Sequence, residues 1–439
     1  MNIWNFNKPE HKGKSKFAGT FELLNSNLKG NGIVFGKAKS QILVKPPNIE
    51  GNVLLVGAPG TGKSSAVIIP SLLSWKGSAL CFDIKGEISR ITKEKREENN
   101  NIIVFDPESP NCDKYNPIGL CNTVAKAQEL ARTLIPVPKD GDPYWSTSAQ
   151  SVFAAFVYKG YLRNVTLSEI CKVLMSNSNK KIVKYLEKET IPEVKRLASN
   201  IFDLGEKTLG SIMSQLRTNI TTLANDRAIE NATNGSDWNP SDLENNTTIY
   251  IKVSEAMLRQ YKDLWTIIIN QIVSYLMKRP EYINPPILLA LDELPRLGKI
   301  NSLMDALATL RSRNTHLLLS VQSLAQLDAI YGKINRKIIA DNSSYKLILS
   351  AGDPETQRYF SNLAGQTTVK NESITKEKKS LLKNLFFTDD EKEKPKVNTS
   401  YSSEPLMRPE EFGRINKGEG LLFAKNHNPI NLKLQYWFQ

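Results

Sequence analysis

The feature that most constrains this chain is the turn GAPGTGKSS at residues 57–65, within the longer run VLLVGAPGTGKSSAVIIPSLL. Apolar residues precede the turn, and an apolar segment with helical periodicity follows it. This is the full P-loop pattern between a buried strand and a helix, in which glycines let consecutive backbone N–H groups point into one concavity. A glycine-rich turn without a ligand is the alternative, and the flanking strand and helix argue against it. We therefore predict a nucleotide-phosphate site lined by Gly57, Ala58, Pro59, Gly60, Thr61, Gly62, Lys63, Ser64 and Ser65.

A P-loop also needs an acidic partner on a neighbouring strand. The run ILLALDELPRL supplies one, because five apolar residues end in Asp292 and Glu293. We expect Lys63 to reach the β- and γ-phosphates, and Ser64 and Asp292 to hold Mg²⁺. Glu293 would then polarise the attacking water. An Asp-Glu pair alone is more often a helix N-terminal charge, but after a buried strand in a P-loop protein it favours ATP hydrolysis.

Three further polar residues are candidates for this chemistry. Gln322 ends the run HLLLSVQ, where its amide could contact the γ-phosphate or its water; a solvated helix N-terminus is the alternative. Arg311 and Arg313 lie shortly before the same run, where an arginine in a ring ATPase can reach a neighbour's nucleotide. A surface salt bridge is the alternative for each arginine, and it is the better one for Arg313.

The remaining pattern predicts an α/β fold with a parallel-rich sheet. Short apolar runs alternate with helix-length periodic segments, which is typical of strands joined by helices. The expected strands lie at residues 53–56, 78–82, 102–105, 248–253, 287–291, 316–321 and 346–350, with later strands in GLLFAK (420–425) and NLKLQYW (431–437).

Two segments interrupt this pattern. Residues 120–236 carry apolar residues at i, i+3, i+4 spacing and few β-branched runs, which predicts an inserted all-α domain. It would divide the nucleotide-binding domain into residues 1–119, which include an N-terminal segment, and residues 237–439. The run at 370–400 is densely charged with both signs, and we expect a flexible surface insertion whose LLKNLFF patch is a candidate docking element.

Charge and composition narrow the class of protein. Of the 439 residues, 58 are Lys or Arg and 45 are Asp or Glu, so the net charge is +13. This excess favours an anionic partner, nucleic acid or an acidic membrane surface, although it is also compatible with a simple solubility charge. The cysteines form no CxxC pair and the three histidines are far apart, which argues against a zinc site, a relaxase or a nuclease. No run approaches the ~20 apolar residues of a membrane span, and the N-terminus has no signal-peptide core.

Several motifs together resemble one known family. In order, GAPGTGKSSAVIIPSLL, FDIKGE, VFDPESPNCDKYNPI, LALDELPRLGKI, LLLSVQSLAQLDAIYG, LILSAGDPETQRYFSNLAGQ and EPLMRPEEF are similar to the TraG/TraD-type coupling proteins of bacterial conjugation and type IV secretion. The resemblance covers most of the chain and includes a helical insertion where that family has its all-α domain. Lys63, Ser64, Asp292, Glu293 and Gln322 match the family's nucleotide motifs, and Arg311 matches the position of its arginine finger.

This resemblance implies a RecA-like ATPase that uses ATP and Mg²⁺ and is active as a homo-hexamer, with monomers in dilute solution. Its implied partners are single-stranded DNA, relaxase and relaxosome proteins, components of the secretion channel and a separate membrane anchor protein. Many members begin with transmembrane helices, and this sequence shows none. We therefore expect a cytoplasmic protein at the inner face of the cell membrane, either a branch without an anchor or a chain lacking it.

Two other functions stay open. A partition- or packaging-type DNA motor shares the same core, but it would carry a winged-helix DNA reader for which the chain after residue 406 is too short. A docking platform for secreted proteins that does not hydrolyse ATP is disfavoured because every residue of the nucleotide site is intact.

Overall fold

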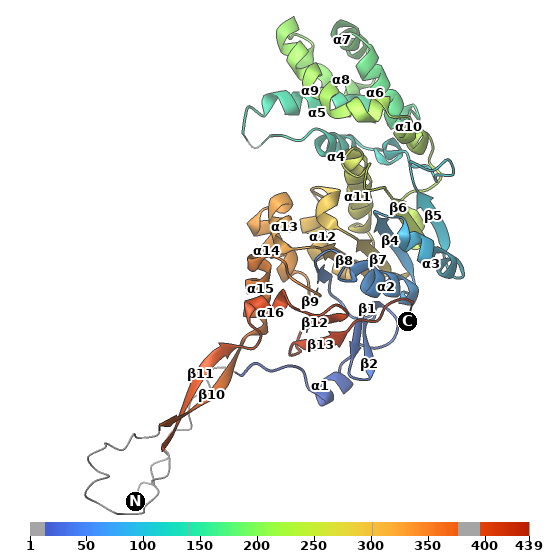
Figure 1. The fold of residues 1–439 in the computed structure, drawn as a ribbon. Helices are drawn as coiled ribbons and strands as arrows, with labels where there is room; N and C mark the ends of the chain where they lie inside the picture. The colour runs from blue at the N-terminus through green and yellow to red at the C-terminus, as the bar shows by residue number, and fades with distance from the viewer. Residues whose placement is uncertain (1–13, 139, 301, 376–395, 439) are drawn as a thin grey trace, which may run out of the picture.

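The computed structural model describes residues 14–138, 140–300, 302–375 and 396–438. Its centre is an eleven-stranded sheet with the order β2-β1-β13-β12-β9-β3-β8-β7-β4-β6-β5 (Figure 1). The strands are β1 (Ile33–Ala38), β2 (Gln41–Lys45), β3 (Val53–Val56), β4 (Ser78–Asp83), β5 (Asn101–Phe105), β6 (Thr247–Lys252), β7 (Ile287–Leu291), β8 (Thr315–Val321), β9 (Tyr345–Ile348), β12 (Glu419–Ala424) and β13 (Ile430–Lys433).

Seven neighbouring strands, from β9 through β3 to β5, run parallel. Every residue of β3, β4, β7 and β8 is buried, because helices cover both faces of this part of the sheet. Continuous apolar runs are the pattern of such doubly covered strands. The seven strands expected from these runs are confirmed to within two residues at each end, and so is the parallel-rich α/β fold.

The other end of the sheet is antiparallel and differs from expectation. β12 pairs with β9 and β13, and β1 pairs with β13 and β2. β1 and β2 were not predicted, because Gly36 at φ 138° and an irregular register beside it interrupt the apolar alternation. The strand expected at 431–437 is too long: β13 ends at Lys433, and although Leu434 N still donates to Gly418 O at 2.7 Å in the register of the ladder, Trp437 N donates to Ser65 O at 3.1 Å.

Helices pack on both faces of the sheet and enclose two apolar cores. One core contains Leu54, Leu289 and Leu319, and the other contains Leu55, Leu288 and Leu318, as the alternation of a strand requires. The helices around the sheet are α2 (Ile69–Ser74), α3 (Glu87–Glu97), α11 (Lys262–Leu276), α12 (Leu303–Thr309), α13 (Leu324–Tyr331), α14 (Lys333–Asp341), α15 (Pro354–Ala364) and α16 (Pro409–Phe412), with α1 (Thr20–Leu24) before β1.

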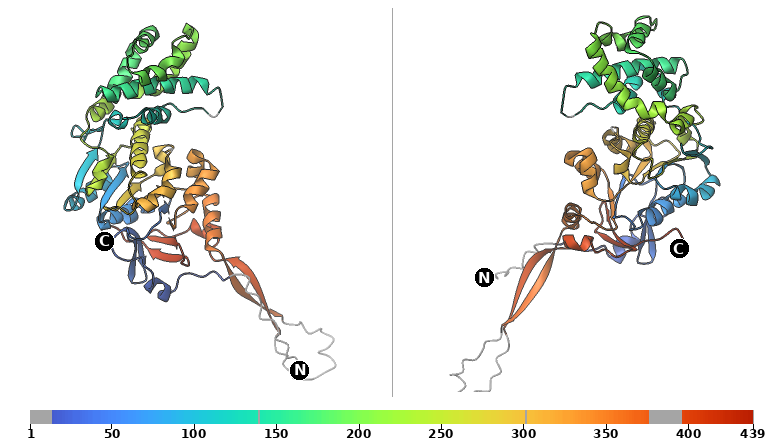
Figure 2. Two further views of the ribbon diagram at one scale, coloured as in Figure 1. Left: turned by 180° about the vertical axis from the view of Figure 1, so that it is seen from behind. Right: turned by 45° about the horizontal axis from the view of Figure 1, so that its top comes forward.

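Between β5 and β6 the described residues form helices and no strand, as the periodicity of this interval predicts. Their outer members gather at one end of the molecule (Figures 1 and 2). The apolar core of this region is continuous with the core on one face of the sheet. The exact boundaries at 120 and 236 stay a prediction. The helices are α4 (Val124–Leu134), α5 (Tyr144–Leu162), α6 (Leu167–Ser176), α7 (Asn179–Glu187), α8 (Pro192–Ala198), α9 (Glu206–Asn225) and α10 (Arg227–Thr233).

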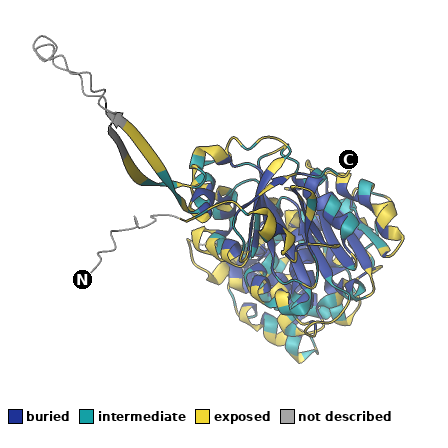
Figure 3. Ribbon diagram, turned by 90° about the horizontal axis from the view of Figure 1, so that it is seen from below, coloured by how far each residue is buried: buried dark blue, intermediate teal, exposed yellow. Residues whose placement is uncertain are grey.

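A separate two-stranded ribbon projects from the opposite end of the molecule. β10 (Gln366–Thr375) pairs antiparallel with β11 (Lys396–Pro405) in unbroken register, and it stands clear of the buried sheet (Figure 3). The ribbon includes residues 370–375 and 396–400 of the segment expected to be a flexible surface insertion, and its flexibility stays a prediction. Threonine and valine along both strands, and Tyr401 in β11, favour extended backbone. The ladder between the two strands satisfies the backbone hydrogen bonds without a core. The LLKNLFF patch lies outside the described residues.

Candidate functional site

The loop after β3 has the shape that phosphate binding requires. Gly60 and Gly62 adopt φ of 76° and 99°, a left-handed conformation that glycine tolerates. A side chain at Gly57 would meet Thr61 Oγ1 at 2.6 Å, so the loop closes tightly there. Thr61 Oγ1 donates to the carbonyl of Ala58 at 2.7 Å and braces the turn. The next residues start a helical segment, Lys63–Ile68, that continues into α2, so the loop presents helix N-terminal N–H groups to an anion.

Lys63 is held at the mouth of this loop. Its side chain is 6% exposed, and its Nζ donates to the carbonyl of Gly57 at 2.7 Å. The same Nζ lies 3.4 Å from Glu293 Oε1. The ammonium therefore spans the loop and the acidic end of β7, the place where a terminal phosphate would bring negative charge.

Asp292 follows β7 and is buried beside the loop. Its Oδ2 accepts from Ser64 Oγ at 3.0 Å, and its Oδ1 accepts from Ser320 Oγ at 3.0 Å. Burial, and then the neighbouring Glu293 carboxylate, raises the pKa of Asp292 above its usual range. A hydroxyl and a carboxylate are hard oxygen ligands of the kind that Mg²⁺ uses together with phosphate oxygens. The donor set therefore fits Mg²⁺, with Ser64 and Asp292 as the residues that would hold it.

Glu293 adopts a strained backbone. Its φ and ψ are 52° and 49°, which for a residue other than glycine costs about 1–3 kcal/mol. Its Oε2 accepts from Gln322 Nε2 at 2.9 Å, and Gln322 in turn contacts Gln326. Gln322 and Lys63 thus hold the Glu293 carboxylate over the loop, where it can orient a water molecule.

These side chains line one cavity of about 810 Å³. Lys63, Ser64, Asp292, Glu293 and Gln322 all border it, so five predicted site residues come together as the strand ends of β3, β7 and β8 suggest. Parallel strands place their carboxyl ends at one edge, and this is where α/β sheets bind ligands.

The two arginines lie elsewhere. Arg311 pairs with Glu50, and Arg313 pairs with Glu281 at 3.7 Å. Arg311 borders a different cavity beside Gly51, before β3 begins, whereas the P-loop follows the end of β3. Arg311 therefore lies at the amino ends of the parallel strands, whereas the phosphate cavity lies at their carboxyl ends. It does not belong to the phosphate cavity of its own subunit.

Sequence reasoning missed several residues that border the phosphate cavity. They come from the end of β4, the loop after it and the start of α3, from Glu255 and Arg296, from the turn before β12, and from the C-terminal segment after β13. The segment is the least expected, since it lies about 370 residues from the P-loop and carries no known motif. The missed residues are Asp83, Ile84, Lys85, Glu87, Ile88, Glu255, Arg296, Lys417, Gly418, Tyr436 and Phe438.

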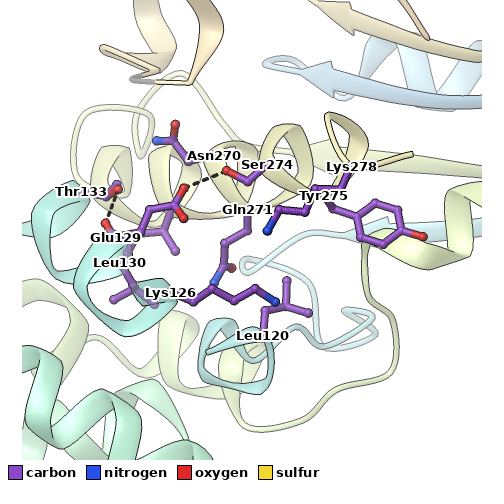
Figure 4. Close-up of a pocket in the computed structure, with 11 residues that line it drawn as sticks. Leu120, Lys126, Glu129, Leu130, Thr133, Asn270, Gln271, Ser274, Tyr275 and Lys278 are labelled. Carbon is purple, nitrogen blue, oxygen red and sulfur yellow. Dashed lines mark hydrogen bonds between the residues drawn. The ribbon is translucent and has the colours of Figure 1, made fainter. Parts of the chain in front are cut away.

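A second cavity, of about 80 Å³, lies between α4 and α11 (Figure 4). Its lining combines the aliphatic Leu120, Leu130 and Ile267 with polar side chains, and Ser274 Oγ donates to Glu129 Oε1 at 2.7 Å across it. It has neither glycine-rich backbone nor an acid pair. This cavity marks the joint between the helical region and the sheet and does not resemble a phosphate site.

The fold and the site together define a RecA-like P-loop protein. The chain matches the family described as type IV secretory system conjugative DNA transfer over residues 21–439. It therefore belongs to this family of type IV secretion and conjugation coupling proteins, as the sequence motifs suggested.

Its relatives are distant in sequence. Protein VirD4 of Agrobacterium fabrum is 25% identical over 463 residues, which cover 99% of this chain and 67% of that protein. The conjugal transfer protein TraG of Escherichia coli is 24% identical, over 78% of this chain and 60% of that protein. VirD4 of Rhizobium radiobacter is matched over 64% of its length. This chain thus spans about two thirds or less of these relatives.

Solved structures support the same fold. The bacterial conjugative coupling protein TrwBdeltaN70 has a TM-score of 0.71 at 17% identity, covering 97% of this chain and 92% of that one. TrwB in complex with ADP and Mg²⁺ also has a TM-score of 0.71, covering 97% and 93%. VirB4 of Thermoanaerobacter pseudethanolicus is less similar, with a TM-score of 0.54. Among the described residues, no helix combines the length and apolar content needed to cross a membrane.

Proposed function

We propose that this chain is a Mg²⁺-dependent ATPase that drives single-stranded DNA toward a type IV secretion or conjugation channel. The main support for ATPase activity is the position of Glu293, which contacts Lys63 and Gln322 over the P-loop. The TrwB complexes with an ATP analogue and with ADP and Mg²⁺ support the choice of nucleotide.

In this proposal, different site residues bind the phosphates, hold Mg²⁺ and activate the attacking water. The loop N–H groups and Lys63 bind the β- and γ-phosphates, and Lys63 exchanges its contact with Gly57 for a phosphate oxygen. Ser64 and Asp292 would hold Mg²⁺, which when bound would spread the charge that develops on the phosphate oxygens. Glu293 orients water in line with the γ-phosphate and draws its proton, and Gln322 keeps the carboxylate in place.

The first test is Glu293→Gln. The amide keeps the size of the side chain but cannot take a proton, so we expect ATP binding within about threefold of wild type and hydrolysis slower by about 10²–10⁴, as for a lost general base. Phosphate release and equilibrium binding of ATP measure the two effects. Glu98→Gln, an exposed acid that pairs with Lys95 away from the cavity, is the control. Hydrolysis by Glu293→Gln at the wild-type rate would refute the assignment.

The second test concerns DNA. The net charge of +13 and the family support binding to the phosphate backbone of single-stranded DNA, without sequence preference. The logarithm of affinity should then fall by about 0.7 per contacted phosphate for each tenfold rise in salt. Titration of labelled oligonucleotides of different sequence, with nucleotide present, measures this slope. Undetectable binding at low salt would exclude DNA as the direct substrate and favour a docking platform for secreted proteins.

The partners follow from the same proposal. A coupling protein would receive DNA bound to relaxase and other relaxosome proteins and pass it to channel components at the inner face of the membrane, with a separate anchor protein as a further partner. Co-purification of the full chain with relaxase, with and without the DNA, tests this order. Capture that is independent of relaxase would contradict it.

A further inference from the structure

The segment after β13 crosses directly over the P-loop. Leu434 N donates to Gly418 O at 2.7 Å, and Trp437 N donates to Ser65 O at 3.1 Å. These backbone bonds fix the segment at both ends of its crossing. Its side chains are therefore held against the nucleotide cavity by main-chain geometry.

Two of these side chains form an aromatic pair at the cavity wall. The rings of Tyr436 and Phe438 are stacked, with centroids 5.3 Å apart and planes at 23°. Tyr436 lies on the loop itself, since a Cβ at Gly62 would be 3.2 Å from its ring. Phe438 is 63% exposed although it is apolar and braced edge-on by Trp437. An ordered ring with a free face beside a phosphate site is suited to a flat ligand.

The direction of a bound nucleotide is set by the rest of the site. Ser64 contacts Asp292, and Lys63 contacts Glu293, so the terminal phosphate lies on that side of the loop. The remainder of the nucleotide must leave on the other side, and the C-terminal segment contacts the loop there, at Gly62 and Ser65. Both sides border one cavity. Tyr436 and Phe438 are the aromatic residues among its described lining.

We propose that Tyr436 and Phe438 form the nucleobase subsite, with a purine ring stacked on the pair. The proposal rests on the nucleotide site described above and names how that site holds the base. Stacking uses the face of a ring and not its hydrogen-bonding edge, so adenine and guanine nucleotides should bind within a few-fold of each other. Cytosine and uracil nucleotides, with a smaller ring, should bind more weakly.

The test compares a nucleotide with its phosphates alone. Base–aromatic stacking corresponds to about 5- to 150-fold in affinity per base. We expect Phe438→Ala, and Tyr436→Ala with it, to weaken binding of a non-hydrolysable ATP analogue by such a factor. Binding of inorganic tripolyphosphate with Mg²⁺ should stay unchanged, and the preference for purine over pyrimidine nucleotides should shrink. Phe438→Trp should retain both properties. Phe21→Ala, which removes an aromatic side chain that is 81% exposed in α1, is the matched control.

The outcomes separate this proposal from the ATPase. If the alanine variants lost tripolyphosphate as strongly as the ATP analogue, the segment would only brace the loop and the base subsite would be refuted. If they bound both ligands like wild type, it would also be refuted, even with ATP hydrolysis intact. A wild-type chain that bound the ATP analogue through this pair but never hydrolysed ATP would refute the ATPase and support the subsite.

Discussion

At the scale of single residues, the buried pair Lys45 and His316 is the most unusual feature outside the nucleotide site. Both side chains are nearly inaccessible, and Lys45 Nζ donates to His316 Nδ1 at 2.8 Å. Burial lowers the pKa of Lys45 to about 7, against an opposing effect of Glu50. Burial, and then Lys45, lowers the pKa of His316 well below its usual range. Burial therefore favours the uncharged form of both side chains. The histidine is already neutral when Lys45 loses its proton.

This pair predicts a pH dependence of stability. In the unfolded chain Lys45 keeps a pKa of about 10.4, so between pH 7 and about 10.4 the unfolded state binds more protons than the folded state. The folded state should gain stability from this group as pH rises through that window, by up to about 1.4 kcal/mol per pH unit.

Lys45→Met tests this by removing the titrating group. The difference in unfolding free energy between wild type and variant should change with pH across the window, whatever its absolute value. Urea unfolding at several pH values between 7 and 10 measures it, with Lys76→Met, an exposed lysine, as the control. A constant difference between wild type and Lys45→Met would contradict the assigned pKa.

Residue by residue, the phosphate side of the site was predictable and the base side was not. Lys63, Asp292 and Gln322 each follow a buried apolar run, and the topology of parallel strands brings such strand ends together. Tyr436 and Phe438 reach the site because the chain leaves the β12–β13 ladder after Leu434, so that Trp437 N donates to Ser65 O, and no local sequence pattern predicts this departure. The run NLKLQYW alternates like a strand throughout, so its last residues look like sheet.

At the scale of elements, the parallel half of the sheet was predictable from the sequence, and the antiparallel half was less so. β3, β4, β7 and β8 are buried on both faces, so their sequences are largely apolar and easy to recognise. β2 is short and pairs with β1, which contains a glycine at an irregular register, and β1 joins the rest of the sheet through β13, a partner nearly 400 residues away. Contacts so distant in sequence leave little local pattern.

The β10–β11 ribbon is an element that the sheet does not need. Its strands pair with each other, and its base is closed by a hydrogen bond from Leu406 N to Gly365 O at 2.9 Å. If the ribbon were deleted, the two residues to be joined, Gly365 and Leu406, would therefore already lie side by side. Lys14 bridges to Thr367 near this base, so a small local contact is lost with the ribbon.

We predict that residues 366–405 can be replaced by two glycines without loss of the nucleotide site. The melting temperature should change by only a few degrees, because surface segments with little buried apolar area contribute little to stability. ATP affinity should stay within about twofold of wild type, since the ribbon borders no part of the phosphate cavity. Differential scanning calorimetry and nucleotide binding measure both. An unfolded product would show that the ribbon is part of the cooperative core.

At the scale of the whole molecule, Arg311 lies far from the nucleotide cavity of its own subunit. β8 runs from the neighbourhood of Arg311 to Gln322, so its seven residues separate the arginine from the nucleotide cavity by roughly 20 Å. An arginine side chain cannot bridge that distance within one subunit. Arg311 is half exposed and held by Glu50 at the far edge of the sheet. A head-to-tail contact brings opposite edges of two copies together, and six such contacts close a ring.

We therefore predict that Arg311 acts on the nucleotide of a neighbouring subunit in a homo-hexamer that is mostly monomeric when dilute. Specific activity should then rise more than linearly with protein concentration. An arginine finger contributes about 10³–10⁵ in rate, so Arg311→Ala alone and Lys63→Ala alone should each be nearly inactive. In an equal mixture, a subunit with intact Lys63 meets a neighbour with intact Arg311 at about a quarter of the contacts, and about a quarter of the activity should return.

Arg313→Ala, which loses only the contact with Glu281, should stay active and is the control. Failure of the mixture to regain activity although mixed oligomers form, or full activity of Arg311→Ala, would exclude the arginine from the neighbour's site.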